Sequence, residues 1–219
     1  MSNSYAEGFS LYTATGDRKY LNHSERQRAL ATMTALEPSQ ALFALTLAWT
    51  GARISEVLAL NPTSFQIEGS IVALHTLKRR RPVVREVPIP PWLMTELNRC
   101  FGLSARQSDP LTNKLRLWRW CRVTGWRIIK RVMHRSGIEG GQACPRGFRH
   151  AFGVGALQGG VPITLLQRWL GHARLSTTSI YADVMGPEEL AFAAQYWRWS
   201  DGHGEPPIPR GMITARRAH

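Results

Sequence analysis

The most informative stretch of this chain is LLQRWLGHARLSTTSIYADV, residues 165–184. We expect a helix that begins at Pro162 and ends at Gly171, followed by a second helix in the polar half of the stretch. His172 comes directly after the glycine, and Tyr181 follows nine residues later. The sequence therefore places an imidazole and a phenol near one helix end.

Two upstream segments carry arginines in a similar setting. TGARISEVLAL, residues 50–60, has Arg53 at the start of a short amphipathic helix. PRGFRHAFG, residues 145–153, has Arg146 and Arg149 three positions apart, which puts both on one face of a helix.

Arginines, a histidine and a tyrosine suit attack on a phosphodiester without a metal ion. The transition state gathers negative charge, which two guanidiniums and a third donor neutralise. A phenol, with a reference pKa of about 10, gains from a cationic environment and a nearby base. Lys78, at a hairpin tip, would protonate the leaving sugar oxygen. Each residue has a structural alternative: Arg53 as a carboxylate partner, Tyr181 as packing and His172 as a helix cap.

The composition independently favours a polyanionic partner. The 219 residues include 28 Lys and Arg against 15 Asp and Glu, a formal charge of +13. Such an excess usually marks a nucleic acid or an anionic membrane as partner, although it also serves solubility. No secretory signal and no membrane span can be recognised. We therefore expect a cytoplasmic, nucleoid-associated protein that does not bind membranes.

No metal site and no cofactor is expected. The three cysteines, Cys100, Cys121 and Cys144, are scattered and form no Cys-x-x-Cys pair. Their spacing predicts neither a disulfide framework nor zinc binding.

The residue patterns predict an α+β fold that is predominantly α-helical with a small antiparallel β-sheet. β-Branched residues on both sides of the basic turn KRRR predict a hairpin of roughly Ser70–Leu77 and Val83–Ile89. Residues 1–21 are interpreted as a loosely attached arm, 22–200 as one domain and 201–219 as a disordered tail. Helices are expected from Asn22 or Ser24 to before Pro38, over 39–50, from Arg53 to Leu60, from Pro91 through to Ser136, from Pro145 to Gly159 and around Glu188–Trp199.

One segment concentrates the positive charge. Pro110 to Ile138 contains eight basic residues and no acidic one. Its helical part has Trp126, Ile129 and Met133 on one face, which we expect to pack on the core. The cationic side, which includes Arg127, Lys130, Arg131 and Arg135, would lie against DNA phosphates or would be a solvated surface.

Taken in order, these segments resemble the catalytic domain of the tyrosine recombinases, the lambda-integrase or phage integrase family, from about Tyr20 to Met185. The resemblance implies a site-specific DNA recombinase that forms a 3′-phosphotyrosyl intermediate. It implies these roles: Arg53 and Arg149 as catalytic arginines, Lys78 as the hairpin lysine with Arg79 as a competitor, His172 as a catalytic histidine, Tyr181 as the nucleophile, Glu56 and His150 as supporting residues, and Arg79, Arg80, Arg127, Lys130 and Arg131 as DNA contacts.

The resemblance also implies partners. Double-stranded DNA at specific sites would be the substrate, and four protomers would assemble in the synapse, with the helix around Glu188–Trp199 docked on a neighbour or on its own domain. The outcome would be integration, excision, inversion or resolution of a mobile element or plasmid. Three alternatives remain: a type IB topoisomerase, a non-catalytic accessory protein derived from a recombinase, and an RNA-binding module, which explains only the charge.

The chain departs from the family pattern in two places. Arg146 stands where the family usually has histidine, and an arginine cannot act as a base near neutral pH. We expect Arg146 to point at the phosphate with Arg53 and Arg149, and to lower the pKa of Tyr181. Only about twenty residues precede the domain, where the family usually has a DNA-clamping domain. Either the domain grips DNA with its own basic surface, or an accessory DNA-binding protein completes the clamp.

Overall fold

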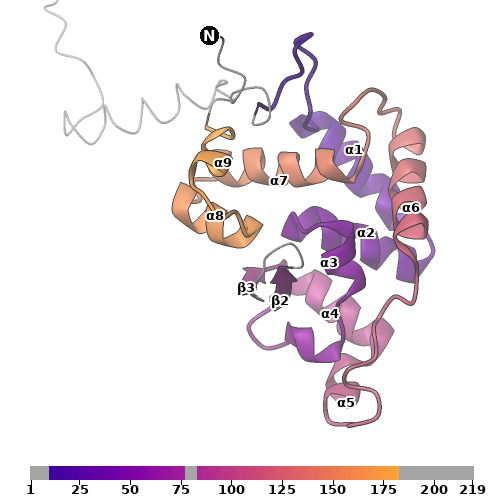
Figure 1. Ribbon diagram of the computed structural model, residues 1–219. Coiled ribbons are helices and arrows are strands. Elements are labelled where there is room, and N and C mark those ends of the chain that lie inside the picture. The colour runs from indigo at the N-terminus through magenta and orange to yellow at the C-terminus, as the bar shows by residue number, and fades with distance from the viewer. Residues whose placement is uncertain (1–9, 77–82, 183–219) are drawn as a thin grey trace, which may run out of the picture. The chain divides into compact units, whose positions relative to one another are not determined.

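The computed structural model describes residues 10–76 and 83–182 (Figure 1). Three of the basic residues discussed above, Lys78, Arg79 and Arg80, lie outside these ranges. The helix expected around 188–199 and the tail 201–219 lie outside them as well.

The described chain is mostly helical and carries one small antiparallel sheet, so the predicted fold class is confirmed. The sheet has the order β1-β2-β3, and both strand pairs are antiparallel. Figure 1 shows helices arranged around α2 and α3, with the sheet next to α4 and α8. The elements are α1 His23–Thr34, α2 Pro38–Thr50, α3 Ile54–Leu58, the 3-10 turn η2 Pro62–Ser64, β1 Phe65–Gln66, β2 Ile71–Thr76, β3 Val83–Pro88, α4 Pro91–Phe101, α5 Leu103–Gln107, α6 Arg122–Arg135, α7 Pro145–Gln158, α8 Ile163–Leu170 and α9 Ser176–Ser179.

Helix α2 forms the centre of the core because its sequence is apolar on nearly every side. Nine of its thirteen residues are buried, and it packs against α1, α4, α6 and α7. The carboxylate of Glu37 caps its first turn, and Gly51 ends it at φ 60°. Only glycine adopts that left-handed conformation without cost, so the chain turns sharply here and leads directly into α3.

The segment before α1 packs on the domain, contrary to the loose attachment expected for residues 10–21. Leu11, Tyr20 and Leu21 are buried, and Arg18 pairs with Glu25 at 3.1 Å. Asn22 and Glu25 form the capping box that starts α1. Three apolar side chains without clear periodicity gave no signal of this packing, because only the tertiary fold buries them.

The hairpin forms where predicted, with β2 and β3 paired from Ile71↔Pro88 to Thr76↔Val83. Val72, Leu74 and Val87 point into the core, as strand alternation requires. Strand β1 was not predicted, because a strand of two residues is too short to show an alternation of apolar and polar side chains.

The continuous helix expected from Pro91 to Ser136 is wrong between α5 and α6. Residues 108–121 contain turns and no regular helix. Trp118 anchors this segment: its ring packs edge-on against Phe43 and Phe101, and its Nε1 donates to the Ser39 carbonyl at 2.9 Å. Burying this large side chain ties the segment to the core and leaves no regular helix between α5 and α6.

Helix α6 is rotated relative to the predicted amphipathic face. Ile129 and Met133 are buried as expected, but Trp126 is 45% exposed. The cause is Gly125, where a Cβ would come within 2.8 Å of the Phe43 ring. The helix packs through its glycine and turns Trp126 outward. Over residues 10–76 and 83–182, no helix is long and apolar enough to cross a membrane.

Candidate active site

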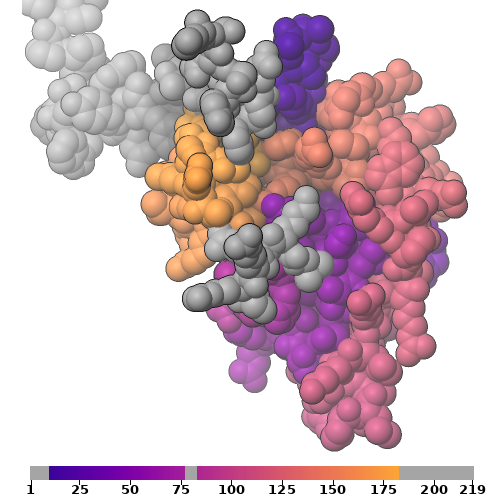
Figure 2. Space-filling view, in the orientation of Figure 1, coloured from indigo at the N-terminus to yellow at the C-terminus, as the bar shows by residue number. Residues whose placement is uncertain are grey.

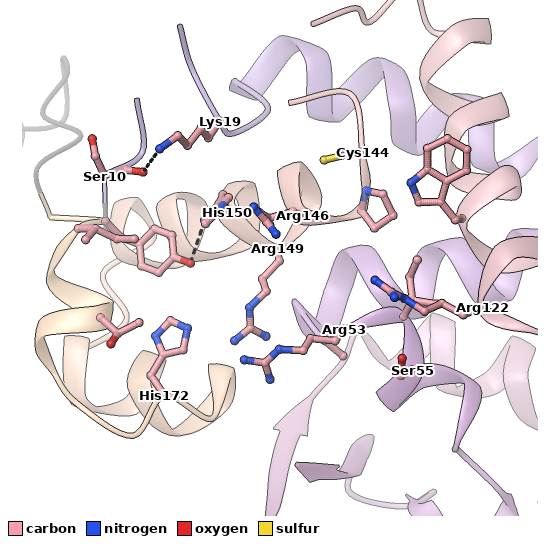
Figure 3. A pocket seen from close by; sticks show the side chains of 17 residues that line it. Ser10, Lys19, Arg53, Ser55, Arg122, Cys144, Arg146, Arg149, His150 and His172 are labelled. Carbon is pink, nitrogen blue, oxygen red and sulfur yellow. Dashed lines mark hydrogen bonds between the residues drawn. The ribbon is translucent and has the colours of Figure 1, made fainter. Parts of the chain in front are cut away.

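One cleft, of about 730 Å³, collects most of the predicted catalytic residues. Its walls include Arg53, Arg146, Arg149, His172 and Tyr181. Five of the six predicted catalytic residues therefore lie together, and the sixth, Lys78, is outside the described residues. Figure 3 shows the side chains of Arg53, Arg149 and His172 pointing toward one another. Figure 2 is the space-filling view of the chain, in which α8 and α9 are orange and α6 is rose.

Arg149 is held in place by the ends of two helices. Its guanidinium donates to the carbonyl oxygens of Gly51 and Leu170, both at 2.7 Å. The side chain comes from the buried face of α7 and is 8% exposed. Burial, with the charge of Arg53, lowers the pKa of Arg149 to about 10, so the group stays protonated at neutral pH. A charged donor is therefore fixed at the floor of the cleft.

Arg53 is oriented by a buried acid. It precedes the first turn of α3, where its Nη1 donates to Glu56 Oε1 at 2.9 Å and its backbone N–H donates to Oε2 at 2.8 Å. Burial would raise the pKa of Glu56, but the hydrogen bonds and charges of Arg85 and Arg53 outweigh it and lower the pKa. Glu56 thus lies where a supporting carboxylate was predicted.

Arg85 is a site-supporting residue that the sequence reasoning missed. Its guanidinium donates to Glu56 Oε2 at 2.6 Å, to the Trp169 carbonyl at 2.7 Å and to Thr76 Oγ1 at 3.0 Å. It is 3% exposed, on the inward face of β3. The signal was present: strand alternation puts Arg85 on the same side as Val87, and a charged residue on that side needs a buried partner.

His172 is neutral and stacked on the tyrosine. Its Nδ1 lies 3.0 Å from Thr178 Oγ1, and its ring is nearly parallel to that of Tyr181 at 6.3 Å between centroids. Burial, then the charges of Arg149 and Arg53, lowers the pKa of His172 to about 3. In the tautomer in which Nδ1 accepts from the Thr178 hydroxyl, Nε2 carries the proton and can donate to an anion.

Tyr181 is 2% exposed and lies flat against α7. A Cβ on Gly153 would come within 2.6 Å of the ring, so the glycine is what allows the approach. Burial raises the pKa of Tyr181 more than Arg149 and Arg53 lower it. Arg146 was expected to lower this pKa, but the cations that lower it are Arg149 and Arg53, and desolvation of the phenolate outweighs both.

His150 lies closer to Tyr181 than its predicted supporting role requires. Its Nδ1 is 3.2 Å from Tyr181 Oη (dashed in Figure 3). Burial, followed by the charges of Arg149, Arg146 and Lys19, lowers the pKa of His150 to about 4.

Arg146 and Arg149 differ in surroundings although they share α7. Arg146 is on the wall of the cleft, whereas Arg149 is buried in its floor. Convergence of both on one phosphate stays a prediction. Four further lining residues were not foreseen: Ser10, Lys19, Arg122 and Trp126. Lys19 Nζ donates to the Ser10 carbonyl at 3.1 Å, and no sequence pattern linked this segment to the arginines.

The predicted DNA contacts on α6 stay predictions, with different surroundings. Arg127 is exposed, Lys130 Nζ donates to the Ala143 carbonyl at 3.0 Å, and Arg131 donates to Gln40 Oε1 at 3.2 Å. Two of the three side chains thus already have protein partners.

The charge of the cleft suits an anion. Arg53, Arg146 and Arg149 face it together with Lys19 and Arg122, whereas Glu56 is buried between arginines. Among the residues that the structure describes, no group of three or more His, Cys, Asp or Glu side chains is placed to hold a metal ion. The arrangement can bind a phosphate between guanidiniums and present a phenol to it.

Comparison with known proteins agrees with this geometry. The chain matches the phage integrase family over residues 19–186. Tyrosine recombinase XerA of Thermococcus kodakarensis is 29% identical over 169 residues, which are 76% of this chain and 58% of XerA. Tyrosine recombinase XerD of Neisseria meningitidis is 33% identical over 139 residues, 62% of this chain and 47% of XerD.

Solved structures share the fold. The crystal structure of XerA recombinase has a TM-score of 0.64 at 24% identity, over 81% of this chain and 62% of that one. XerH recombinase bound to its difH substrate has a TM-score of 0.65 at 20% identity, over 85% and 59%. The catalytic domain of bacteriophage HP1 integrase has a TM-score of 0.60 at 23% identity, over 84% and 98%.

Since the family match covers most of the chain, this protein belongs to the phage integrase family, the tyrosine recombinases. The resemblance identified from the sequence is confirmed. The chain spans about half the length of the curated XerA and XerD relatives it matches, between 46% and 58%.

Proposed function

We propose that this chain is the catalytic part of a site-specific DNA recombinase, which cuts and rejoins double-stranded DNA through a 3′-phosphotyrosyl bond to Tyr181. The observation that carries the proposal is convergence. Arg53, Arg149, His172 and Tyr181 come from segments far apart in the sequence, and all four line one cationic cleft.

The scissile phosphate would lie between the guanidiniums of Arg53 and Arg149. Arg149 is fixed by two helix carbonyls and Arg53 by Glu56, so both donors are in position before DNA arrives. Preorganised donors stabilise the charge of the transition state without further rearrangement. Neutral His172 adds a third donor through Nε2.

The reaction is transesterification. Tyr181 Oη forms a bond to phosphorus, the bond from phosphorus to the 5′ oxygen breaks, and that oxygen takes a proton from Lys78. The 5′-hydroxyl of a partner strand then attacks the phosphotyrosine and returns the phenol. The number of phosphoester bonds is unchanged, so the two steps require no ATP, and the guanidiniums of Arg53 and Arg149 would take the place of a metal ion at the phosphate.

The partners follow from the same reaction. Strand exchange needs two duplexes, and we propose a homotetramer in the synapse, in a cytoplasmic, nucleoid-associated setting. The substrate would belong to a mobile element or plasmid that is integrated, excised, inverted or resolved. DNA as the partner is supported by the charge of +13 and by XerH, which was solved with its difH substrate.

The decisive experiment uses a nicked suicide duplex that traps the covalent intermediate. The parent chain should become attached to DNA, and Tyr181→Phe should not, at nearly unchanged DNA affinity. A Phe variant that still becomes attached would overturn the assignment. A parent that binds DNA but never attaches favours the non-catalytic accessory protein. Attachment without strand exchange between two defined sites favours a type IB topoisomerase.

A further inference from the structure

We propose that His150, on α7, accepts the proton of Tyr181 when the phenol attacks the phosphate. The inference rests on the proposed function, since it concerns how Tyr181 becomes a nucleophile. The observation behind it is the direct contact: Nδ1 of His150 lies 3.2 Å from Oη of Tyr181 (Figure 3). A base within hydrogen-bond reach of the proton it removes is the first geometric requirement for general-base catalysis.

Close packing fixes this contact. Gly153 lies three residues after His150, nearly one helical turn, and its missing side chain lets the Tyr181 ring rest on the backbone of α7. The two rings are tilted by 50° at 5.9 Å between centroids. Both residues are largely shielded from solvent, so neither side chain is free to take another rotamer easily.

The other groups around the phenol are poor proton acceptors. Arg53, Arg146 and Arg149 stay protonated near neutral pH. The Nδ1 of His172 is occupied by Thr178 Oγ1. The carboxylate oxygens of Glu56 accept from Arg53 and Arg85, the first on Oε1 and Oε2 and the second on Oε2. Among the cleft residues described, His150 is the basic group that touches Oη.

The charges that face His150 keep it in the accepting form. The charges are those of Arg146 and Arg149 on its own helix and of Lys19 before α1; the neutral titratable groups that also face it are His172 and Tyr181, from beyond α8. Together with burial, the three cations lower the pKa of His150 to about 4, so the ring is neutral across the neutral range. With the proton on Nε2, Nδ1 is free to accept.

The neutral His150 ring is a weak base toward a phenol that has not begun to react. The reaction itself makes the phenol proton easier to remove. As the bond from Oη to phosphorus forms, the phenol proton becomes far more acidic, and Nδ1 receives it. A phosphate anion between Arg53 and Arg149 also offsets their charges, which raises the proton affinity of His150.

The proton balance closes over both steps. In cleavage the O–P bond to Tyr181 forms, the proton moves from Oη to Nδ1, and the 5′ oxygen leaves with a proton from Lys78. In rejoining the 5′-hydroxyl gives its proton back to Lys78, and the imidazolium of His150 returns its own to the released phenol. The active site ends as it began.

The test is single-turnover cleavage of the suicide duplex at saturating protein. His150→Asn places an amide near Nδ1 that keeps a hydrogen bond but accepts no proton, and His150→Ala removes both. Both variants should cleave about 10²–10⁴-fold more slowly at unchanged DNA affinity, with a rate that rises with pH where the parent is flat. Imidazole should restore part of the rate to the Ala variant only. His23→Ala, an exposed histidine on α1, is the matched control.

A second measurement separates chemistry from folding. With 3,5-difluorotyrosine at position 181, whose phenol is more acidic, the penalty of His150→Asn should shrink at least about tenfold. A DNA substrate with a 5′-bridging sulfur, which needs no proton on leaving, should leave the penalty in place.

The outcomes are distinct. His150→Asn cleaving like the parent, or a penalty that fluorination leaves unchanged, would overturn the role of His150 while Tyr181→Phe still fails to attach. A Tyr181→Phe variant that attaches would instead overturn the proposed function.

Discussion

Arg85 and Glu56 form a buried ion pair directly beneath the cleft, with 2.6 Å between Nη2 and Oε2 and at most 2% of either side chain exposed. The same guanidinium reaches the Trp169 carbonyl and Thr76, so one residue of β3 connects the sheet with α3 and α8. Glu56 in turn holds Arg53. The position of Arg53, which we propose contacts the phosphate, therefore depends on a pair that is buried away from the cleft surface.

Removing Arg85 should destabilise the fold. Arg85→Met leaves Glu56 buried with Arg53 alone, and breaking a buried pair costs about 3–5 kcal/mol. Urea denaturation measures the decrease in the free energy of unfolding. Arg99→Ala, which breaks an exposed pair with Glu96, should lower the free energy of unfolding far less, because water and salt screen that pair. Equal decreases for the two variants would contradict the central position of Arg85.

Stability should depend on the ionisation of Glu56 in acid. Its pKa is lower in the folded chain than the unfolded reference of about 4.3, so its stabilisation is complete above that reference. The contribution is lost as the pH falls through the lower, folded pKa. Urea titrations at several pH values give the difference in the free energy of unfolding between the parent and Glu56→Gln, which should narrow below about pH 4.3. A difference that widens there would mean that folding raises the pKa of Glu56.

Gly153→Ala should impair cleavage more than DNA binding. The added Cβ would lie 2.6 Å from the Tyr181 ring and must displace it from His150 and from the cleft. Covalent attachment to the suicide duplex should fall at least about tenfold, on the scale of a misplaced reacting group. Gly155→Ala, on the same helix with open space around its Cβ, is the matched control and should gain up to about 1 kcal/mol in stability. Similar attachment by the two variants would show that the tyrosine tolerates the shift.

Arg146→Ala should slow cleavage, and Arg146→His should retain substantial activity with a new pH dependence near the reference His pKa of about 6.5. Removing this cation should also raise the pKa of His150, because the charge of Arg146 is one cause of its low value. Single-turnover rates across pH give the first result, and NMR titration of the His150 ring gives the second. If Arg146→Ala cleaves DNA as fast as the parent, Arg146 does not act in the active site.

The basic face of α6 should contribute to DNA binding of every sequence. Neutralising Arg127, Lys130 and Arg131 together should flatten the slope of log K against log salt by about 0.9 for each phosphate that the variant no longer neutralises. Arg127 alone should account for most of the change, since Lys130 and Arg131 already bond to Ala143 and Gln40. Arg99→Gln on α4 is a charge-matched control for one substitution. An unchanged slope in the triple variant would leave α6 as a solvated surface.

Much of the fold was predictable because local signals coincide with tertiary ones. Asn22 caps α1, Gly51 and Gly171 end α2 and α8, and the β-branched runs pair as β2 and β3. The path of residues 108–121 was not predictable, because the burial of Trp118 among distant aromatic rings determines it.

Most residues of the candidate site could be predicted from the sequence, but the contacts between their side chains could not. Motif order identified Arg53, Arg149, His172 and Tyr181, which the fold brings to one cleft. Arg85 required attention to a charged residue on an inward strand position. The contact of His150 with the phenol depends on Gly153, and no spacing in the sequence expresses a close approach between helix and ring.

Arg149 joins the carbonyls of Gly51 and Leu170, and this has an evolutionary consequence. Selection for folding alone would preserve the arginine, because its removal leaves two helix ends without their shared donor. A related gene that had lost the ability to cut DNA would therefore keep Arg149 for architecture. Decay of activity should be sought at position 181, where phenylalanine would maintain the packing against α7 and remove the oxygen that we propose attacks the phosphate.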